Sequence, residues 1–269
     1  MRTCRVGFGI LLLALSACGR TPMQADAAAG EDGVPGASFV TAAPATRSIC
    51  SNEPFPAGHV VVSARNTAHC GATKSGQFNE FVIARVTGDR MVVCSISPLP
   101  ASWAVTHSTG SNSCPESSRD GWAYNVYTIT RITGVPIRLC SVSPMPRGWV
   151  IIQASVWTGC PGSRVVGQPQ NVFTISPVRG PQMSICRTLS PVPDGWVVTQ
   201  AWTGSNCPAS RDKTKPLNVY VIKELAGREM RVCSVSLIPR GWMVVAGTTT
   251  KSCPSASSSN TLTIRNRHA

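Results

Sequence analysis

The chain has 269 residues, of which 14% are charged and 42% are hydrophobic, and its formal net charge is +13. Roughly one domain per 150 residues predicts one or two domains. Only the N-terminus is strongly apolar, which excludes a membrane protein with several spanning helices. The 23 glycines and 21 prolines favour short strands and many turns over long helices. Twelve cysteines are typical of an exported protein rather than a cytosolic one.

The first 18 residues have the three parts of an export signal. Arg2 and Arg5 form a positive end, and residues 6–15 form an apolar run that is too short to span a bilayer. Leu15-Ser16-Ala17-Cys18 follows this run. The motif resembles the lipobox of bacterial lipoproteins.

The resemblance implies that residues 1–17 are a cleaved signal peptide and that Cys18 carries acyl chains such as palmitate. Several acyl chains anchor a protein firmly, because each buried methylene contributes roughly 0.8 kcal/mol. Gly19, rather than an aspartate, follows the cysteine. By analogy with Gram-negative lipoproteins, we expect a lipid-anchored protein of the outer membrane.

Residues 18–47 are rich in small residues and predict a flexible tether with a reach of about 30 Å. The positive charge is compatible with anionic envelope polymers or acidic proteins. No long run of lysine and arginine occurs, so we expect no nucleic-acid partner.

A repeat of roughly 46 residues fills the rest of the chain, the domain 48–269. Each repeat contains two cysteines that are 20 or 21 residues apart. The predicted repeats are 48–91, 92–137, 138–183, 184–230 and 231–269.

Two further motifs recur within the repeats. A proline-rich corner leads into Gly-Trp and a β-branched run, as at Gly148-Trp149 and Gly241-Trp242, and the first repeat has Gly58-His59 instead. Later comes Asn-x-aromatic-x-Ile, whose period of two predicts a strand. A glycine lies between this strand and the next leading cysteine, and we expect a hairpin turn there. Each repeat therefore predicts at least three short strands in an all-β fold.

The phase of the repeats leaves the arrangement open between two architectures. If the strand near 260–264 pairs with the one near 48–51, the repeats close into a propeller-like ring without exposed sheet edges. Otherwise they form an open β array in which each unit touches only its neighbours. Closure is the favoured alternative.

The ten cysteines of the repeats predict disulfides, because the protein is exported and their number is even. Pairing within each repeat is the simplest connectivity. It gives the bonds Cys50–Cys70, Cys94–Cys114, Cys140–Cys160, Cys186–Cys207 and Cys233–Cys253. Metal binding is not expected, since no Cys-x-x-Cys occurs and no histidine recurs beside the cysteines.

No catalytic motif stands out, so we expect neither an enzyme nor a cofactor. The carboxylates are scattered, and no Gly-x-Ser-x-Gly elbow occurs. His59 and His69 in the divergent first repeat are the best remaining candidates for a catalytic site.

A binding surface is better supported by the sequence. Trp157 and Trp202 precede the second cysteine of adjacent repeats, and Asn206 lies in the same loop as Trp202. Exposed indoles beside hydroxyl and amide groups suit sugars. The tryptophans that recur after the proline corner are instead expected in the core. They are Trp103, Trp149, Trp196 and Trp242.

The repeats resemble the cysteine and Gly-Trp repeats of uncharacterised bacterial exported proteins, which implies no particular activity. We expect a non-enzymatic, outer-membrane-anchored repeat lipoprotein that binds an envelope or extracellular ligand, either a glycan or a protein. One alternative is a periplasmic inhibitor or immunity protein, and another is a hydrolase with its site in the first repeat. The oligomeric state stays open.

Overall fold

The computed structural model describes residues 45–71, 78–116, 122–162, 169–209, 217–254 and 259–267. The predicted signal peptide, the lipidation site Cys18 and most of the tether lie outside the described residues. Among the described residues, no helix is long and apolar enough to cross a membrane.

The described residues form fifteen strands, three per repeat, and two short 3-10 helices. The strands are β1 (Thr46–Cys50), β2 (His59–Arg65), β3 (Glu80–Arg85), β4 (Arg90–Cys94), β5 (Trp103–Thr109), β6 (Val126–Arg131), β7 (Ile137–Cys140), β8 (Trp149–Ser155), β9 (Val172–Pro177), β10 (Gln182–Cys186), β11 (Trp196–Trp202), β12 (Val219–Glu224), β13 (Glu229–Cys233), β14 (Trp242–Thr248) and β15 (Thr261–Asn266). The helices are η1 (Ala68–Cys70) and η2 (Trp122–Tyr124). The all-β prediction is confirmed.

Each repeat folds into its own antiparallel sheet, in which the third strand lies between the first and the second. In the first repeat the order is β1-β3-β2, with Ile49 opposite Phe81 and Val61 opposite Ile83. The strand after the recurring asparagine is therefore central, and it pairs with the cysteine strand of its own repeat. The same order recurs in all five sheets.

This pairing corrects the expected hairpin across the glycine between repeats. Gly88 has φ +67, as a tight turn requires, but β3 before it and β4 after it belong to different sheets. The glycine thus marks a turn between sheets and says nothing about which strands pair.

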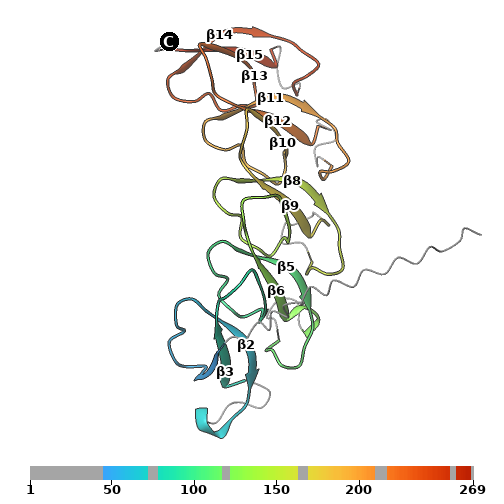
Figure 1. The fold of residues 1–269 in the computed structure, drawn as a ribbon. Helices are drawn as coiled ribbons and strands as arrows, with labels where there is room; N and C mark the ends of the chain where they lie inside the picture. Colours follow the sequence, from blue (N-terminus) through green and yellow to red (C-terminus); the bar gives the residue numbers. More distant parts are fainter. Residues whose placement is uncertain are drawn as a thin grey trace, which may run out of the picture. The chain divides into compact units, whose positions relative to one another are not determined.

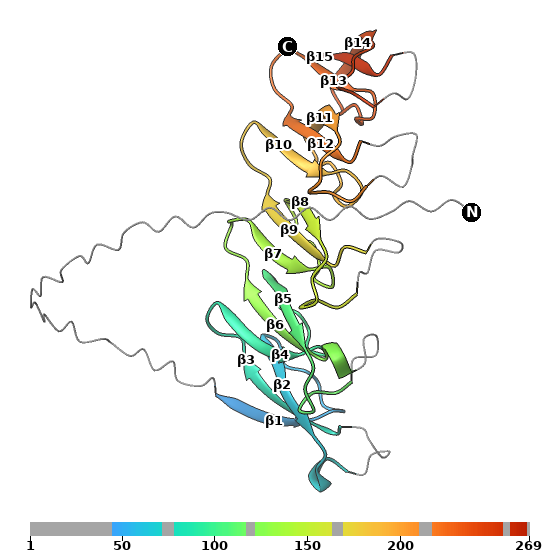
Figure 2. The same cartoon turned by 90° about the vertical axis from the view of Figure 1, so that its right-hand side faces the viewer.

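The prediction that the repeats close into a ring is wrong for the same reason. β15 lies between β13 and β14, so it has no free edge to offer β1, and no strand of the first sheet pairs with the fifth among the described residues. Contacts between sheets link β2 with β4, β5 with β7, β8 with β10 and β11 with β13 (Figures 1 and 2). The repeats form the open array.

All five disulfides join the two cysteines of one repeat, as predicted. The pairs are Cys50–Cys70, Cys94–Cys114, Cys140–Cys160, Cys186–Cys207 and Cys233–Cys253, with Cα–Cα distances of 5.2 to 5.4 Å. Loops of this length stabilise the folded state by about 3 kcal/mol each if the main effect is on the entropy of the unfolded chain.

The asparagine before each central strand holds the loop that carries the second cysteine. In the third repeat, the Asn171 side chain accepts a hydrogen bond from the Trp157 N–H (2.8 Å) and donates to the carbonyls of Trp157 (2.8 Å) and Cys160 (2.9 Å). The equivalent asparagines make the same three kinds of bond and are buried. They are Asn79, Asn125, Asn218 and Asn260. This role explains why an asparagine recurs there, since one amide side chain satisfies three backbone groups.

The core of the array lies between consecutive sheets. At the first junction, Val61 and Ile83 pack against Cys94, Cys114 and Val126 of the next repeat. Each later disulfide is buried in this way against the preceding sheet, whereas Cys50 and Cys70 are half-buried. We call the side of a repeat that carries its disulfide the N-terminal face, and the side that carries its second strand the C-terminal face.

A serine hydrogen bond joins each pair of neighbouring repeats. The second strand of every sheet has an irregularity in its register, between Val61 and Ser63 in the first repeat. Beside it, the Val61 N–H donates to Ser97 Oγ (2.8 Å), and Ser97 Oγ donates back to the Val61 carbonyl (3.1 Å). Ser143, Ser190 and Ser236 accept the same bond at the next three junctions. We call these four residues the junction serines.

A backbone bond completes each junction. Three residues after Val61, the Ala64 N–H donates to the carbonyl of Ser113, the residue before the second cysteine of the next repeat (2.8 Å). The equivalent bonds are Ser108 N–H to Gly159, Ala154 N–H to Asn206 and Ala201 N–H to Ser252. The edge of each inner sheet is therefore partly covered by the repeat that follows.

Candidate binding site

Trp157 and Trp202 are the most exposed of the tryptophans whose burial is described. Their exposed fractions are 39% and 46%, whereas Trp103 is only 7% exposed. Both lie near the end of the second strand of their repeat, toward the second cysteine.

The two indoles precede the second cysteine of adjacent repeats but do not occupy equivalent positions. Trp202 is the last residue of β11 and pairs with Val219. Trp157 lies two residues beyond the end of β8, and its N–H bonds to Asn171, a role that Gly204 has in the next repeat. The two rings therefore differ by two residues in register, which agrees with their distances of three and five residues from the second cysteine of the repeat.

Each indole lies over the glycine two residues later, which explains the Trp-Thr-Gly sequence. A methyl group placed on Gly159 would come within 2.6 Å of the Trp157 ring, and one on Gly204 within 2.8 Å of the Trp202 ring. A side chain at either glycine would displace the ring. The motif thus fixes how the indole lies on the loop.

Trp157 has further neighbours that Trp202 lacks among the described ring contacts. The His107 ring of the preceding repeat lies 5.3 Å from the Trp157 ring, and the Arg138 guanidinium lies 5.6 Å from its centroid. These groups cover part of the Trp157 indole. Trp202 is the freer surface for a ligand to stack on.

Asn206, the third predicted binding residue, has a junction role through its backbone. Its carbonyl accepts the Ala154 N–H, while its side chain is exposed. The side chain lies in the loop between Trp202 and Cys207 and is free to reach a ligand there.

Sequence reasoning missed a groove between the proline corners of the third and fourth repeats. It has a volume of about 730 Å³ and is lined by Trp149, Trp196, Arg147 and Asp194, together with several prolines. Both indoles pack against the core with one side and are half-buried, so the prediction that they are core residues holds only in part. The volume is in the range of small-molecule sites.

The first repeat does not bring its two histidines together. His59 is the first residue of β2, whereas His69 lies in η1, beyond the last residue of that strand. Six residue steps at about 3.3 Å separate the ends of the strand by about 20 Å. His59 and His69 therefore do not form a shared catalytic site.

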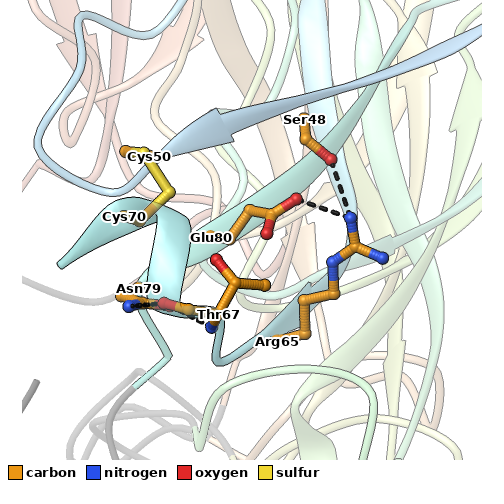
Figure 3. Close-up of polar contacts among 7 residues, drawn as sticks. All are labelled: Ser48, Cys50, Arg65, Thr67, Cys70, Asn79 and Glu80. Carbon is orange, nitrogen blue, oxygen red and sulfur yellow. Dashed lines mark hydrogen bonds and ion pairs between the residues drawn. A yellow bond between two sulfur atoms is a disulfide. The ribbon is translucent and has the colours of Figure 1, made fainter. Parts of the chain in front are cut away.

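A different polar cluster occupies the first repeat. Arg65 Nη2 lies 2.6 Å from Glu80 Oε1 and 3.2 Å from Ser48 Oγ (Figure 3). The Glu80 side chain is 6% exposed and that of Arg65 is 60% exposed. The hydrogen bond from Arg65 is the main cause that lowers the pKa of Glu80 to about 2. Glu80 is thus ionised at neutral pH and is a poor proton donor.

No metal-binding constellation accompanies this cluster. No group of three or more histidine, cysteine, aspartate or glutamate residues lies together in the described parts of the chain. No family model, no curated protein and no solved structure matches this chain.

Proposed function

We propose that this protein is a non-enzymatic repeat lipoprotein, anchored in the bacterial outer membrane through Cys18, that binds a glycan of the cell envelope. The observation that carries the proposal is the exposed Trp202 indole, held over Gly204 at the end of β11. A rigid aromatic surface beside a polar loop suits a sugar ring, whose apolar face stacks while its hydroxyl groups find partners.

The loop next to Trp202 supplies the polar groups. Ser205 and Asn206 are exposed there, and the disulfide at Cys207 fixes the end of the loop. A loop held in this way loses little conformational entropy on binding. Trp157 in the preceding repeat offers a second, partly covered indole. Several weak contacts along one polymer would add through their proximity.

Co-sedimentation with purified peptidoglycan sacculi tests the proposal. Trp202→Ala is expected to weaken binding by about 1–3 kcal/mol, because it removes an aromatic anchor. Trp202→Phe keeps a stacking ring and is expected to retain most of the binding. Trp103→Ala is the control for folding, since a buried indole contributes about 3–5 kcal/mol to stability.

Two results would contradict the proposal. One is sacculus binding that is unchanged in Trp202→Ala at an unchanged melting temperature. The other is tight, equimolar capture of a single periplasmic enzyme with no affinity for sacculi, which would favour the inhibitor alternative.

A further inference from the structure

Each end of the array has a face without a neighbouring repeat among the described residues. The C-terminal face carries the donor groups of a junction, and the N-terminal face carries the acceptor groups. At the C-terminal face of the fifth repeat, β14 is exposed along most of its length, with Val244 at 46%. The equivalent residues of the first four repeats are almost fully buried, at 2% or less. They are Val61, Val105, Ile151 and Val198.

Val244 and Gly247 stand where inner repeats donate to the next repeat. Val244 has the register position of Val61, opposite the central isoleucine Ile264, and Gly247 has that of Ala64. No sixth repeat is present among the described residues to provide a serine hydroxyl and a carbonyl. An exposed sheet edge with apolar side chains is a template for association.

The N-terminal face of the first repeat has the matching acceptors. Glu53 stands where three of the junction serines stand, three residues after the leading cysteine, and its N–H makes the same turn bond to the Cys50 carbonyl (3.0 Å). His69 precedes the second cysteine, as Ser113 does in the next repeat. Glu53 and His69 are exposed, and a hollow of about 60 Å³ lies beside them and the Cys50–Cys70 disulfide.

One carboxylate of the N-terminal face can meet the basic C-terminal end. The fifth sheet and its loops, residues 228–267, have six basic residues and one acid. The N-terminal face of the first repeat has the exposed carboxylate of Glu53, whereas the carboxylate of Glu80 is already paired with Arg65.

From these observations we propose that the protein associates head to tail with a second copy of itself, the C-terminal face of one molecule receiving the N-terminal face of the next. In this contact the Val244 N–H donates to the Glu53 carboxylate and the Gly247 N–H donates to the His69 carbonyl. The Cys50–Cys70 disulfide packs on Val244, as the inner disulfides pack on the preceding sheet.

This contact is weaker than an inner junction. Glu80 replaces the valine that packs at three of the four inner junctions, and a glutamate cannot donate to the Val244 carbonyl as a serine does. We therefore expect reversible association that weakens as salt increases, because charges contribute to it. A contact between two different faces also permits chains longer than a dimer.

Sedimentation velocity of the full chain in detergent, over a range of protein concentrations, tests the inference. Wild type is expected to form larger species as its concentration rises, and less so in high salt. Glu53→Lys alters only the N-terminal face, and Val244→Asp alters only the C-terminal face. Each variant alone is expected to associate at least about tenfold more weakly than wild type. Glu116→Lys makes the same charge change on an exposed loop of the second repeat and is expected to behave as wild type.

The mixture of the two variants gives the sharpest result. Glu53→Lys retains the C-terminal face and Val244→Asp retains the N-terminal face, so the mixture is expected to associate through these two faces. Association of Glu53→Lys that equals wild type would indicate pairing of two C-terminal faces and overturn the inference. A mixture that stays monomeric, or a wild type that is monomeric at all concentrations, would overturn it as well.

Discussion

Single residues show where a repeat departs from its neighbours and what the departure costs. Ser102 has φ +63, a left-handed conformation that glycine adopts at the equivalent position of the other four repeats. The N–H of the residue after it bonds to the Pro100 carbonyl, which closes the turn before β5. A non-glycine residue in this region is strained by about 1–2 kcal/mol.

Replacing this serine is therefore expected to stabilise the protein. Ser102→Gly should increase the free energy of unfolding by about 0.5–1 kcal/mol, because relief of strain exceeds the extra entropy that glycine gives the unfolded chain. Urea denaturation followed by tryptophan fluorescence measures the change. Gly195→Ser makes the reverse substitution at a position with φ +77 and should destabilise by a similar amount. A destabilised Ser102→Gly would contradict this explanation.

Glu80 predicts how stability depends on pH. Its pKa is about 2 in the folded protein, below the ordinary value of 4.5, because Arg65 donates a hydrogen bond to the ionised form. The contribution of Glu80 is therefore complete above pH 4.5 and is lost as the pH falls toward 2. Urea midpoints measured over this range should fall more steeply in wild type than in Glu80→Gln. Equal slopes for the two proteins would show that the ion pair is absent in solution.

At the scale of the element, the asparagine before each central strand links two parts of a repeat. It fastens the loop of the second cysteine to the sheet through three hydrogen bonds, as Asn171 does with Trp157 and Cys160. The same loop provides a carbonyl to the preceding repeat, here that of Gly159 to Ser108. The position of this loop therefore affects the junction with the preceding repeat as well as its own repeat.

Removing this side chain should destabilise the protein strongly. Asn171→Ala leaves one N–H and two carbonyl groups without a partner, and we expect a loss of about 2–4 kcal/mol. Asn171→Asp keeps the acceptor for the Trp157 N–H but has no N–H to donate, so it should also destabilise. Asn52→Ala, at an exposed position, serves as the control. Equal melting temperatures for Asn171→Ala and Asn52→Ala would rule out a stabilising role for the three hydrogen bonds of Asn171.

The sequence predicts some of these elements better than others. Strands and disulfides are predictable because a period of two and a constant cysteine spacing report local geometry. The pairing partner is not, because alternation is the same whichever neighbour a strand has. Gly88 shows that a turn can be located correctly while the pairing inferred across it is wrong.

The surface is harder to predict than the elements. Trp103 and Trp202 are 7% and 46% exposed, as the proline corner before Trp103 and the second cysteine after Trp202 predict. Trp149 and Trp196 share the motif of Trp103 but are half-buried and line a groove between two repeats, which the motif does not indicate. The junction serines, by contrast, leave a signal in the sequence: a serine recurs three residues after the leading cysteine in the second, third and fifth repeats, and the first repeat has Glu53 there.

At the scale of the whole molecule, stability is shared between neighbouring repeats. Each sheet of three strands is too small for an independent core, and the buried clusters include residues of two or three consecutive repeats. Such arrays behave approximately as a sum of repeat and junction terms. The exposed C-terminal face of the fifth repeat and the N-terminal face of the first are therefore the parts of the described array that lack a junction contribution.

Residue-resolved amide hydrogen exchange tests this junction model most directly. The Val198 N–H bonds to Ser236 Oγ (2.7 Å), whereas Val244, at the same register position, is 46% exposed. In dilute protein, the Val198 amide is expected to exchange about tenfold or more slowly than that of Val244, since one hydrogen bond of this kind contributes roughly 1 kcal/mol and the next repeat excludes water. Raising the protein concentration should slow exchange at Val244 as molecules associate. Equal exchange at Val198 and Val244 in dilute protein would show that the next repeat does not protect the edge, and would contradict the model.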